Sequence, residues 1–430
     1  MRERPQVQAV LWGELRMHAP SADLSKCPLP HHVVFVCANY FPRVTGVGVV
    51  LDGWARRLAR LGILTTVLAP QYPDCAYYPP HDPPANLQVV RMPSRPVPFA
   101  PGLRVMQWSH APVRHLVDAL ANQRVVIHAQ DPLNAGQVAV RLARLIKAPL
   151  ITHVHSPVFG MEVRDWLGDA VGAAAEPLAH CIVRRAVLRT LRASKRVVAV
   201  SEYVANLFAE RSLGKPEVLP CGIESPVPED VIQDVRGRHG IPPESPLLLY
   251  VGRLEPDKGV NDLLAAFQRV LRALPQAVLL LVGGGPLTRR YERTAARLGI
   301  ARHTVFAGWR AHREVWSYYR QADLFVIANA DEAQGLVVLE AQACGLPVAG
   351  YRSGGIGLMV RSGETGLLCE PRPDALALTI LRLLADRDLR SALGRNGPAW
   401  AQRFRADDSF RALLRVYQEA LLGSGHELRH

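Results

Sequence analysis

The sequence has 430 residues, 49% of them hydrophobic, a length and composition that predict two domains with substantial cores. No apolar run approaches the roughly 20 residues that cross a bilayer, and the first thirty residues lack a signal-type apolar core, so we expect neither a membrane span nor export. Seven scattered cysteines without a CxxC pair favour reduced thiols in the cytoplasm and argue against a zinc site.

Positive charge is concentrated in the first half of the chain. The formal net charge is +13; residues 1–220 hold 25 Lys and Arg against 15 Asp and Glu, whereas residues 221–430 hold 26 against 23. This asymmetry favours an anionic partner for the first half, either nucleic acid or an acidic membrane surface. The alternative is an arginine-rich composition without a specific partner.

The first half alternates short apolar runs with amphipathic stretches. Residues 1–30 lack periodicity and are expected to form a loose extension. Buried parallel strands are predicted at 33–38, 64–69, 125–127, 150–154 and 197–200, and helices at 51–61, 135–146 and 161–196. The Pro- and Tyr-rich segment 70–105 is predicted to be an irregular insertion. The basic face of 161–196 suits either an anionic membrane or ordinary solvent.

Two positions in the first half follow strands at the edge where α/β sheets bind ligands. Gly46 and Gly48 either allow a ligand close to the backbone or serve a loop that needs positive φ. His153 and His155 are two residues apart, so they share a face at the end of strand 150–154. They are either ligand-binding or catalytic groups, or buried structural histidines.

The second half begins after a Pro- and Gly-containing boundary at 220–246 and repeats the strand–helix alternation. Strands are predicted at 247–251, 279–282, 304–306 and 324–327, and a helix at 262–271. Arg253 and Lys258 flank a turn after the first of these strands and could clamp a diphosphate. The glycines at 283–285 do not match the G-x-G-x-x-G fingerprint, which counts against a nicotinamide enzyme. We therefore predict an α/β fold with two doubly wound parallel sheets.

The segment 331–350, DEAQGLVVLEAQACGLPVAG, carries two carboxylates, Glu332 and Glu340. A short buried helix is predicted over 336–343, stopped by Gly345 and Pro347. Gly335 permits close approach to the helix N-terminus, where a phosphate binds readily, and the carboxylates could accept hydrogen bonds from sugar hydroxyls. The alternative is an ordinary strand–turn–helix unit with one solvated and one capping glutamate.

Several motifs in order, GRLEPDKG, ADLFVIANADEAQGLVVLEAQACGLPV and SGETGLL, resemble the retaining family-4 glycosyltransferases of the GT-B fold, over residues 31 to 420. The resemblance implies two Rossmann-like domains facing a cleft. It also implies an extension at 1–30, an acceptor-binding domain at 31–222, a nucleotide-sugar-binding domain at 223–405, and a C-terminal helix at 406–430 that packs back on the first domain.

The same resemblance implies roles for individual residues. Glu332 and Glu340 match the E-x7-E signature, with Glu340 holding the ribose and Glu332 facing the donor sugar. His155, in THVHSP, would line the sugar site and Gly46 the β-phosphate. The implied catalytic residues are His155, Glu332, Arg253 and Lys258; the implied donor-binding residues are Gly46, Arg253, Lys258, Glu332, Gln334, Gly335, Leu336, Val337 and Glu340.

A subgroup is indicated by YFPRVTGV, RMPSRPVPF and EVLPCGIES, which are similar to enzymes that glucosylate diacylglycerol. This implies UDP-glucose as donor, a membrane lipid as acceptor, and docking of a cytoplasmic protein on the anionic inner face of the cell membrane. The implied reaction retains the anomeric configuration by front-face attack, with no metal, no cofactor and no nucleic acid. The alternatives are a transferase using GDP-mannose or building a polysaccharide, and a non-catalytic sugar-nucleotide-binding protein.

Overall fold

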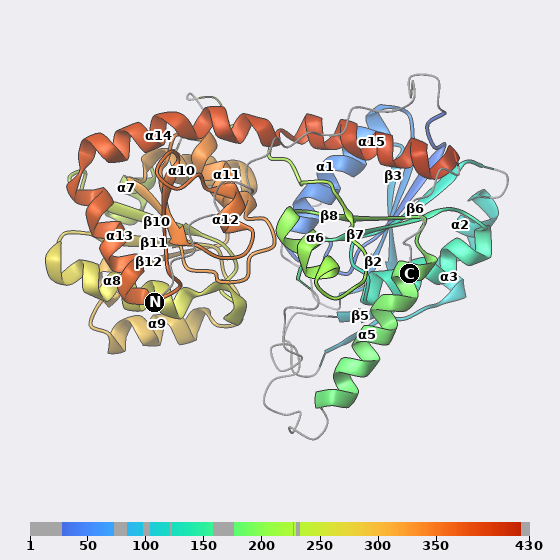
Figure 1. Ribbon diagram of the computed structural model, residues 1–430, viewed down its shortest axis with the longest axis horizontal. Coiled ribbons are helices and arrows are strands. Elements are labelled where there is room, and N and C mark those ends of the chain that lie inside the picture. The colour runs from blue at the N-terminus through green and yellow to red at the C-terminus, as the bar shows by residue number, and fades with distance from the viewer. Residues whose placement is uncertain are drawn as a thin grey trace.

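The computed structural model describes residues 28–72, 84–97, 104–120, 123–157, 176–226, 228 and 233–422, with the side chains of 176–179 excluded. Most of the predicted N-terminal extension and the first part of the predicted helix 161–196 lie outside the described residues. The described chain forms two α/β bodies, seen side by side in Figure 1.

The first body is built on a parallel sheet with strand order β3-β2-β1-β6-β7-β8-β9. Its strands are mostly buried, because helices cover both faces, and this explains their apolar sequences. The order reverses between β1 and β6, so the carboxyl ends of these strands form the switch point where α/β sheets bind ligands. The strands are β1 (His32–Val36), β2 (Leu64–Pro70), β3 (Leu87–Met92), β6 (Val125–Ala129), β7 (Leu150–Val154), β8 (Arg196–Ala199) and β9 (Glu217–Val218).

The second body has a parallel sheet with order β12-β11-β10-β13-β14-β15 and a switch point between β10 and β13. Its strands are β10 (Leu247–Val251), β11 (Val278–Val282), β12 (Thr304–Gly308), β13 (Leu324–Ile327), β14 (Val348–Tyr351) and β15 (Gly366–Cys369). The predicted doubly wound α/β fold is confirmed in both halves.

Helices follow most of the strands. In the first body they are α1 (Gly46–Arg60), α2 (His110–Leu120), α3 (Asn134–Ile146), α5 (Glu176–Ala193) and α6 (Glu202–Ala209). In the second they are α7 (Val235–His239), α8 (Val260–Ala273), α9 (Thr288–Arg297), α10 (His312–Gln321), α11 (Leu336–Ala343), α12 (Ile356–Met359), α13 (Pro373–Ala385) and α14 (Arg387–Ala401). No helix in the described part of the chain is both long and apolar enough to cross a membrane.

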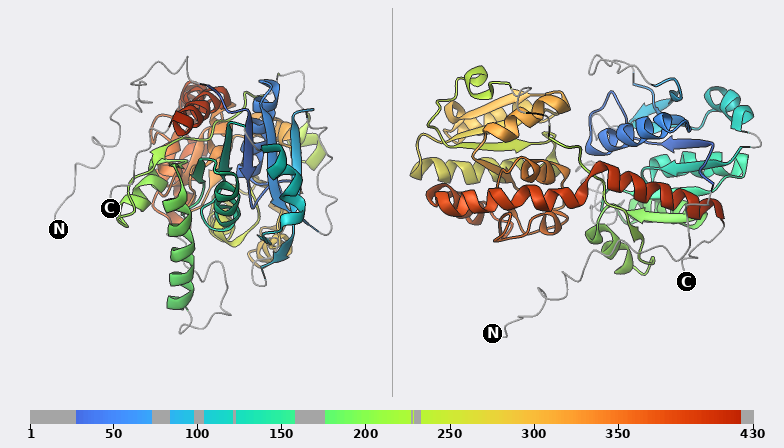
Figure 2. Two further views of the ribbon diagram at one scale, coloured as in Figure 1. Left: turned by 90° about the vertical axis from the view of Figure 1, so that its right-hand side faces the viewer. Right: turned by 90° about the horizontal axis from the view of Figure 1, so that it is seen from above.

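The chain crosses between the two bodies at two places that touch each other. The first crossing is the linker that contains Gly222 and Ile223; the second leads from α14 into α15 (Ala406–Leu422). The Ile223 N–H donates to the Phe404 carbonyl at 2.8 Å, and the Ala406 N–H donates to the Ile223 carbonyl at 2.9 Å. Helix α15 then lies along the first body, where Leu413 and Tyr417 belong to the same core as the first sheet. Figures 1 and 2 show α14 and α15 as a continuous red bridge over both bodies.

Three predictions about elements need correction. The segment 70–105 is not only irregular: its described part contains β3 and an antiparallel pair, β4 (Ser94–Pro96) and β5 (Arg104–Met106). Helix α1 begins at Gly46 rather than at residue 51. The predicted helix 161–196 ends at Ala193, and Arg196 begins β8 instead of extending the basic helix.

Candidate functional site

Two helix N-termini, one from each body, meet where the switch points of the two sheets face each other. Gly335, with φ +89, precedes α11, and Gly46 opens α1. A Cβ placed on Gly46 would lie 3.7 Å from Leu336 Cδ1, so the first turns of α1 and α11 are in contact range. Gly46 and Gly48 are helical, which overturns the alternative that they serve a positive-φ loop. Positive ends of two helix dipoles therefore converge here.

Glu340 is a buried carboxylate on the inner side of α11. It is 8% exposed, and it accepts hydrogen bonds from His312 Nε2 at 2.8 Å and from the Tyr319 hydroxyl at 2.8 Å, both on α10. Burial alone would lower the pKa of His312, but the charge and hydrogen bond of Glu340 together outweigh burial and raise it above its ordinary value. Glu340 is thus neither a solvated nor a capping glutamate.

Glu332 lies in the turn before α11 and binds a lysine. Its Oε2 accepts hydrogen bonds from Lys258 Nζ at 3.1 Å and from Asn329 Nδ2 at 2.7 Å. Lys258 also pairs with Asp257 at 3.1 Å. Burial lowers the pKa of Lys258, yet Glu332 and Asp257 more than compensate, so its net pKa is raised and the lysine is charged at neutral pH. The structure therefore brings Lys258 and Glu332 together as one ion pair.

Arg253 joins the same charged group from the end of β10. Its guanidinium pairs with Glu255 and lies 3.9 Å from Asp257. Arg43, in the loop between β1 and α1, reaches across from the first body to Glu255 at 3.0 Å. Three cations and three carboxylates thus alternate across the junction between the bodies, and their formal charges balance.

His155 follows β7 and faces the linker. Its Nε2 lies 2.9 Å from Gln130 Oε1, its Nδ1 lies 3.8 Å from Cys221 Sγ, and its ring centroid is 4.1 Å from that of His153. Burial, reinforced by the neighbouring His153 and His128, holds the pKa of His155 well below its usual range. The imidazole is therefore neutral at physiological pH, suited to hydrogen bonding rather than to ion pairing.

The remaining predicted donor-binding residues support the junction structurally. Gln334 is buried and pairs through both ends of its amide with the backbone of Cys221, at 3.0 and 2.7 Å. Leu336 and Val337 are partly buried against the apolar cores, and Leu336 contacts the cores of both bodies. Gln334 thus fastens the linker to the second body.

Sequence reasoning missed several residues of this junction. Arg43 stands in the quoted motif YFPRVTGV but was not singled out, and His312 and Tyr319 carry no motif that marks them as partners of Glu340. Two contacts from the start of α6 also join the bodies: Oγ of the capping residue Ser201 donates to the Ala333 carbonyl at 2.6 Å, and the Tyr203 hydroxyl donates to Asp331. Only the folded chain brings these positions to the same loop, so no local spacing could have revealed them.

Comparison with known proteins agrees with this architecture. Family models described as glycosyl transferases group 1 and glycosyltransferase family 4 match residues 231–400 and 44–225. The chain is 30% identical to a D-inositol 3-phosphate glycosyltransferase of Acidothermus cellulolyticus, over 72% of this chain and 79% of that protein. It is also 30% identical to a GDP-mannose-dependent alpha-(1-6)-phosphatidylinositol monomannoside mannosyltransferase of Mycobacterium tuberculosis, over 86% and 93%. Sucrose-phosphate synthase from Thermosynechococcus elongatus shares the fold, with a TM-score of 0.70, 23% identity, and coverage of 90% and 98%.

Proposed function

The chain belongs to the group 1 and family 4 glycosyltransferases of the GT-B fold, and we propose that it moves a hexose from a nucleoside diphosphate sugar to an acceptor hydroxyl with retention of anomeric configuration. The observation that carries the proposal is the group of Arg253, Lys258 and Glu332 beside the N-terminus of α11. Cations and exposed amides at one place suit a diphosphate, and a nearby carboxylate suits sugar hydroxyls.

The diphosphate binds by replacing carboxylates on the cations. Arg253 and Lys258 are already held in place by Glu255, Asp257 and Glu332, so their side chains are ordered toward the junction. A diphosphate oxygen offers the same charge-assisted hydrogen bonds as those carboxylates, and the amides of the first turn of α11 add further donors. Arg43 supplies a third cation from the other body, so closure of the two bodies strengthens the anion site.

Glu340 holds the ribose in this proposal. An ionised carboxylate offers about four lone-pair sites, of which His312 and Tyr319 occupy two, so capacity for two ribose hydroxyls remains. The fixed pair on α10 orients the carboxylate before the nucleotide arrives, which reduces the entropic cost of binding. A glutamine at this position would retain the shape but lose the charge that strengthens the hydrogen bonds.

The chemical step is dominated by electrostatics. As the bond between the sugar and the β-phosphate breaks, negative charge grows on the leaving oxygen, which Arg253, Lys258 and the amides of α11 stabilise. That oxygen accepts the proton of the acceptor hydroxyl on the same face of the sugar, so one C–O bond breaks and one forms with retention. In this proposal His155 hydrogen-bonds the sugar, and because its imidazole is neutral it does not repel the positive charge that develops on the sugar ring.

Two sugar nucleotides are candidate donors, and two types of molecule are candidate acceptors. The subgroup motifs favour UDP-glucose and diacylglycerol, whereas the relative from Mycobacterium tuberculosis is named for GDP-mannose and a phosphatidylinositol monomannoside, and that from Acidothermus cellulolyticus for inositol 3-phosphate. These names favour a phosphorylated inositol, free or in a lipid, over diacylglycerol. GDP-mannose is thus the second candidate donor.

Docking on anionic lipid belongs to the same proposal. The first body carries the excess of basic residues, and α5 extends from it with Ile182 61% exposed beside Arg184 and Arg185 (Figure 1). Basic residues near an anionic surface contribute about 1 kcal/mol each, and salt screens them. Binding to vesicles of anionic phospholipid should therefore weaken as salt rises, and salt-independent binding would count against docking.

The reaction is tested by a screen of UDP-glucose and GDP-mannose against inositol 3-phosphate, phosphatidylinositol and diacylglycerol, with the anomer of each product assigned by NMR. We expect one donor–acceptor pair to give a product whose anomeric configuration matches the donor's. Inversion would contradict the mechanism. Donor binding without turnover on any acceptor, and with the same slow hydrolysis in Glu332→Gln as in the wild type, would instead support a non-catalytic binding protein.

A further inference from the structure

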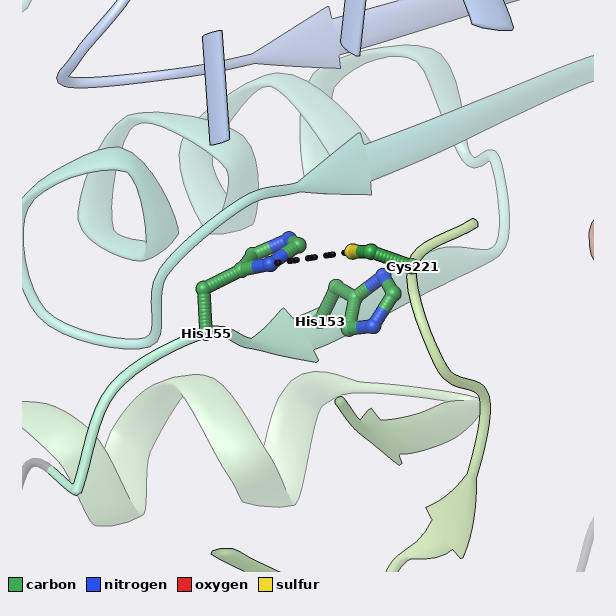
Figure 3. Close-up of side chains that lie close together, drawn as sticks. All are labelled: His153, His155 and Cys221. Atoms are coloured by element: carbon green, nitrogen blue, oxygen red, sulfur yellow. Dashed lines mark hydrogen bonds between the residues drawn. The ribbon is translucent and has the colours of Figure 1, made fainter. Parts of the chain in front are cut away.

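Three potential metal ligands meet at the back of the junction. His153 and His155, at the end of β7, and Cys221, in the linker, each offer one ligand atom, and these atoms lie within 4.8 Å of one another. Figure 3 shows the His155 ring and the Cys221 sulfur facing each other between β7 and the linker, with the His153 ring beside them. The cysteine lies 66 residues from His155 in the sequence, so the spacing of the cysteines, which argued against a zinc site, could not reveal the cluster.

The central histidine of the cluster lacks a well-formed hydrogen bond among the described residues. His153 is fully buried, and neither its Nδ1 nor its Nε2 makes a hydrogen bond of good geometry, although a weaker contact with the Leu219 backbone favours the charged ring. A buried polar group without a partner costs about 1–3 kcal/mol. Such groups are uncommon in folded proteins, and each one calls for an explanation. A cation bound to one ring nitrogen of His153 would supply the missing partner.

The neighbouring histidine is arranged as metal-binding histidines are. His155 Nε2–H donates a hydrogen bond to Gln130 Oε1 at 2.9 Å, so the lone pair of the ring is on Nδ1, which faces Cys221 Sγ at 3.8 Å. A metal-bound histidine usually donates its other N–H to an oxygen in this way, which fixes the tautomer and the ring. In a tetrahedral zinc site the Zn–S bond is about 2.3 Å and the Zn–N bond about 2.0–2.1 Å long. These bond lengths place a sulfur ligand and a nitrogen ligand at a distance from each other that is close to the observed 3.8 Å.

We propose that His153, His155 and Cys221 bind one Zn²⁺ ion, with two imidazole nitrogens, one thiolate and a water molecule as the four ligands. The thiol of Cys221 gives its proton to solvent as the Zn–S bond forms, so one proton is released for each ion bound. Two nitrogens and one sulfur select a borderline-soft ion such as Zn²⁺ or Co²⁺ over Mg²⁺ or Ca²⁺, which prefer oxygen.

Occupancy of this site would inhibit the transferase, a consequence that rests on the proposed function. The ion would occupy Nδ1 of His155, the one ring nitrogen that Gln130 leaves available, and so would remove the lone pair through which the ring could hydrogen-bond the donor sugar. It would also fasten β7 to Cys221, whose backbone is held by Gln334 of the second body, and so restrain movement of the two bodies. The metal thus acts as a negative regulator and takes no part in the chemical step.

Cobalt provides a direct test on the full chain after treatment with a chelator. A Co²⁺ titration should give one equivalent of binding with the thiolate-to-cobalt charge-transfer absorption and the intense visible bands of a tetrahedral site, and Zn²⁺ should displace it. Cys221→Ser should abolish the charge-transfer absorption, and Cys221→Ser and His153→Gln should each weaken binding at least tenfold. Cys181→Ser, which removes an exposed thiol on α5, is the matched control and should bind as the wild type does.

The outcomes separate this proposal from the proposed function. Absence of the cobalt signal in the wild type, its persistence in Cys221→Ser, or its loss in Cys181→Ser would overturn the metal site, whatever the transferase activity. The isosteric Cys221→Ser variant keeps the test decisive if His153→Gln does not fold. Inhibition of transfer by Zn²⁺ in the wild type but not in Cys221→Ser, reversed by a chelator, is the expected functional readout. A cobalt signal from a chain that shows no transfer even after the metal has been removed with a chelator would refute the proposed function alone.

Discussion

Glu340 and His312 form a hydrogen-bonded pair: Glu340 raises the pKa of His312, and His312 orients the Glu340 carboxylate. The side chain of Glu340, taken without its backbone, is 10% exposed and that of His312 is 31% exposed, so their 2.8 Å contact is only partly screened by solvent. The proposed ribose contact relies on this pair, because His312 fixes one oxygen of the carboxylate. The pH dependence of stability therefore reports on the pair directly.

Replacing His312 with Asn should remove a pH-dependent part of the stability. The pKa of His312 is raised in the folded protein, so its contribution is fully present below the unfolded value of about 6.5 and is lost as pH rises through the folded pKa. The difference in denaturant midpoint between wild type and His312→Asn should thus shrink from slightly acidic to alkaline pH. A difference that stays constant over this range would contradict the pairing.

Gly335 tests whether the start of α11 binds the donor. Its φ of +89 makes an L side chain strained by about 1–2 kcal/mol, although the atoms nearest to a Cβ added there would be no closer than 3.6 Å. Gly299, with φ +72 and nothing within 4 Å, is the matched control at the end of α9. Gly335→Ala and Gly299→Ala should destabilise the protein similarly, as measured by thermal unfolding.

Only Gly335→Ala should weaken donor binding, by about tenfold or ~1.4 kcal/mol, because only at Gly335 would the added Cβ and the strained backbone disturb the helix terminus proposed to bind the diphosphate. Calorimetric titration with the donor identified in the screen measures the difference. Equal donor affinities for the two variants would remove the helix terminus from the site.

At the residue scale, the sequence located the principal charged groups but not their partners. Arg253, Lys258 and Glu332 stand in recognisable motifs; in the structure Lys258 pairs with Glu332, and Asp257 lies between Lys258 and Arg253. Arg43, Asn329 and His312 complete the network from distant parts of the chain, and their roles depend on which loops the fold brings together. Gln334 was predicted to bind the donor from its place in the motif. In the structure, both ends of its side-chain amide are hydrogen-bonded to the backbone of Cys221 in the linker.

The elements were predictable where glycine or proline marks their ends. Helix α11 runs over the predicted 336–343, because Gly335 has positive φ before it and Gly345 has positive φ after it. Strands β3, β4 and β5 were missed because prolines and short lengths obscure an alternating pattern. Helix α1 starts earlier than its apolar periodicity, since Thr45 caps it by accepting from the Gly48 N–H.

Helix α15 illustrates how one element stabilises a body distant from it in sequence. The Tyr417 hydroxyl lies 2.9 Å from His128 Nδ1 in the core of the first body. Tyr417→Phe should destabilise the protein by about 1–3 kcal/mol, because it leaves that buried nitrogen unpaired. Leu422→Ala, at a half-exposed site on the same helix, should change stability by no more than about 0.5 kcal/mol. Chemical denaturation compares the two, and similar effects of both changes would contradict this assignment.

At the scale of the whole molecule, the orientation of one body relative to the other depends on the two places where the chain crosses between them. Ser201, Tyr203 and Gln334 connect the bodies near α11, and Gly222 packs against the second crossing. The two-sheet architecture could be predicted from the alternation of strands and helices in the sequence. The contacts between the bodies could not be predicted, because they join residues more than a hundred positions apart.

Gly222→Ala should change how the bodies are oriented. Its Cβ would lie 2.5 Å from the Arg405 carbonyl and 2.6 Å from Ala406 Cα, and backbone atoms cannot move aside without moving α15. Small-angle X-ray scattering should show an altered profile for Gly222→Ala and an unchanged one for Gly357→Ala, where a Cβ meets nothing within 4 Å. Identical scattering from all three proteins would show that this crossing does not set the orientation.

The central claim is that Arg253 and Lys258 bind the diphosphate of a sugar nucleotide between the two bodies. Calorimetric titration with UDP and GDP tests it most directly, with Arg297→Ala, an exposed arginine on α9, as control. We predict that the wild type and Arg297→Ala bind one of the two nucleotides alike, and that Arg253→Ala and Lys258→Ala each bind it about 10–100-fold more weakly. Failure of the wild type to bind either nucleotide, or equal affinity in all four proteins, would contradict the account.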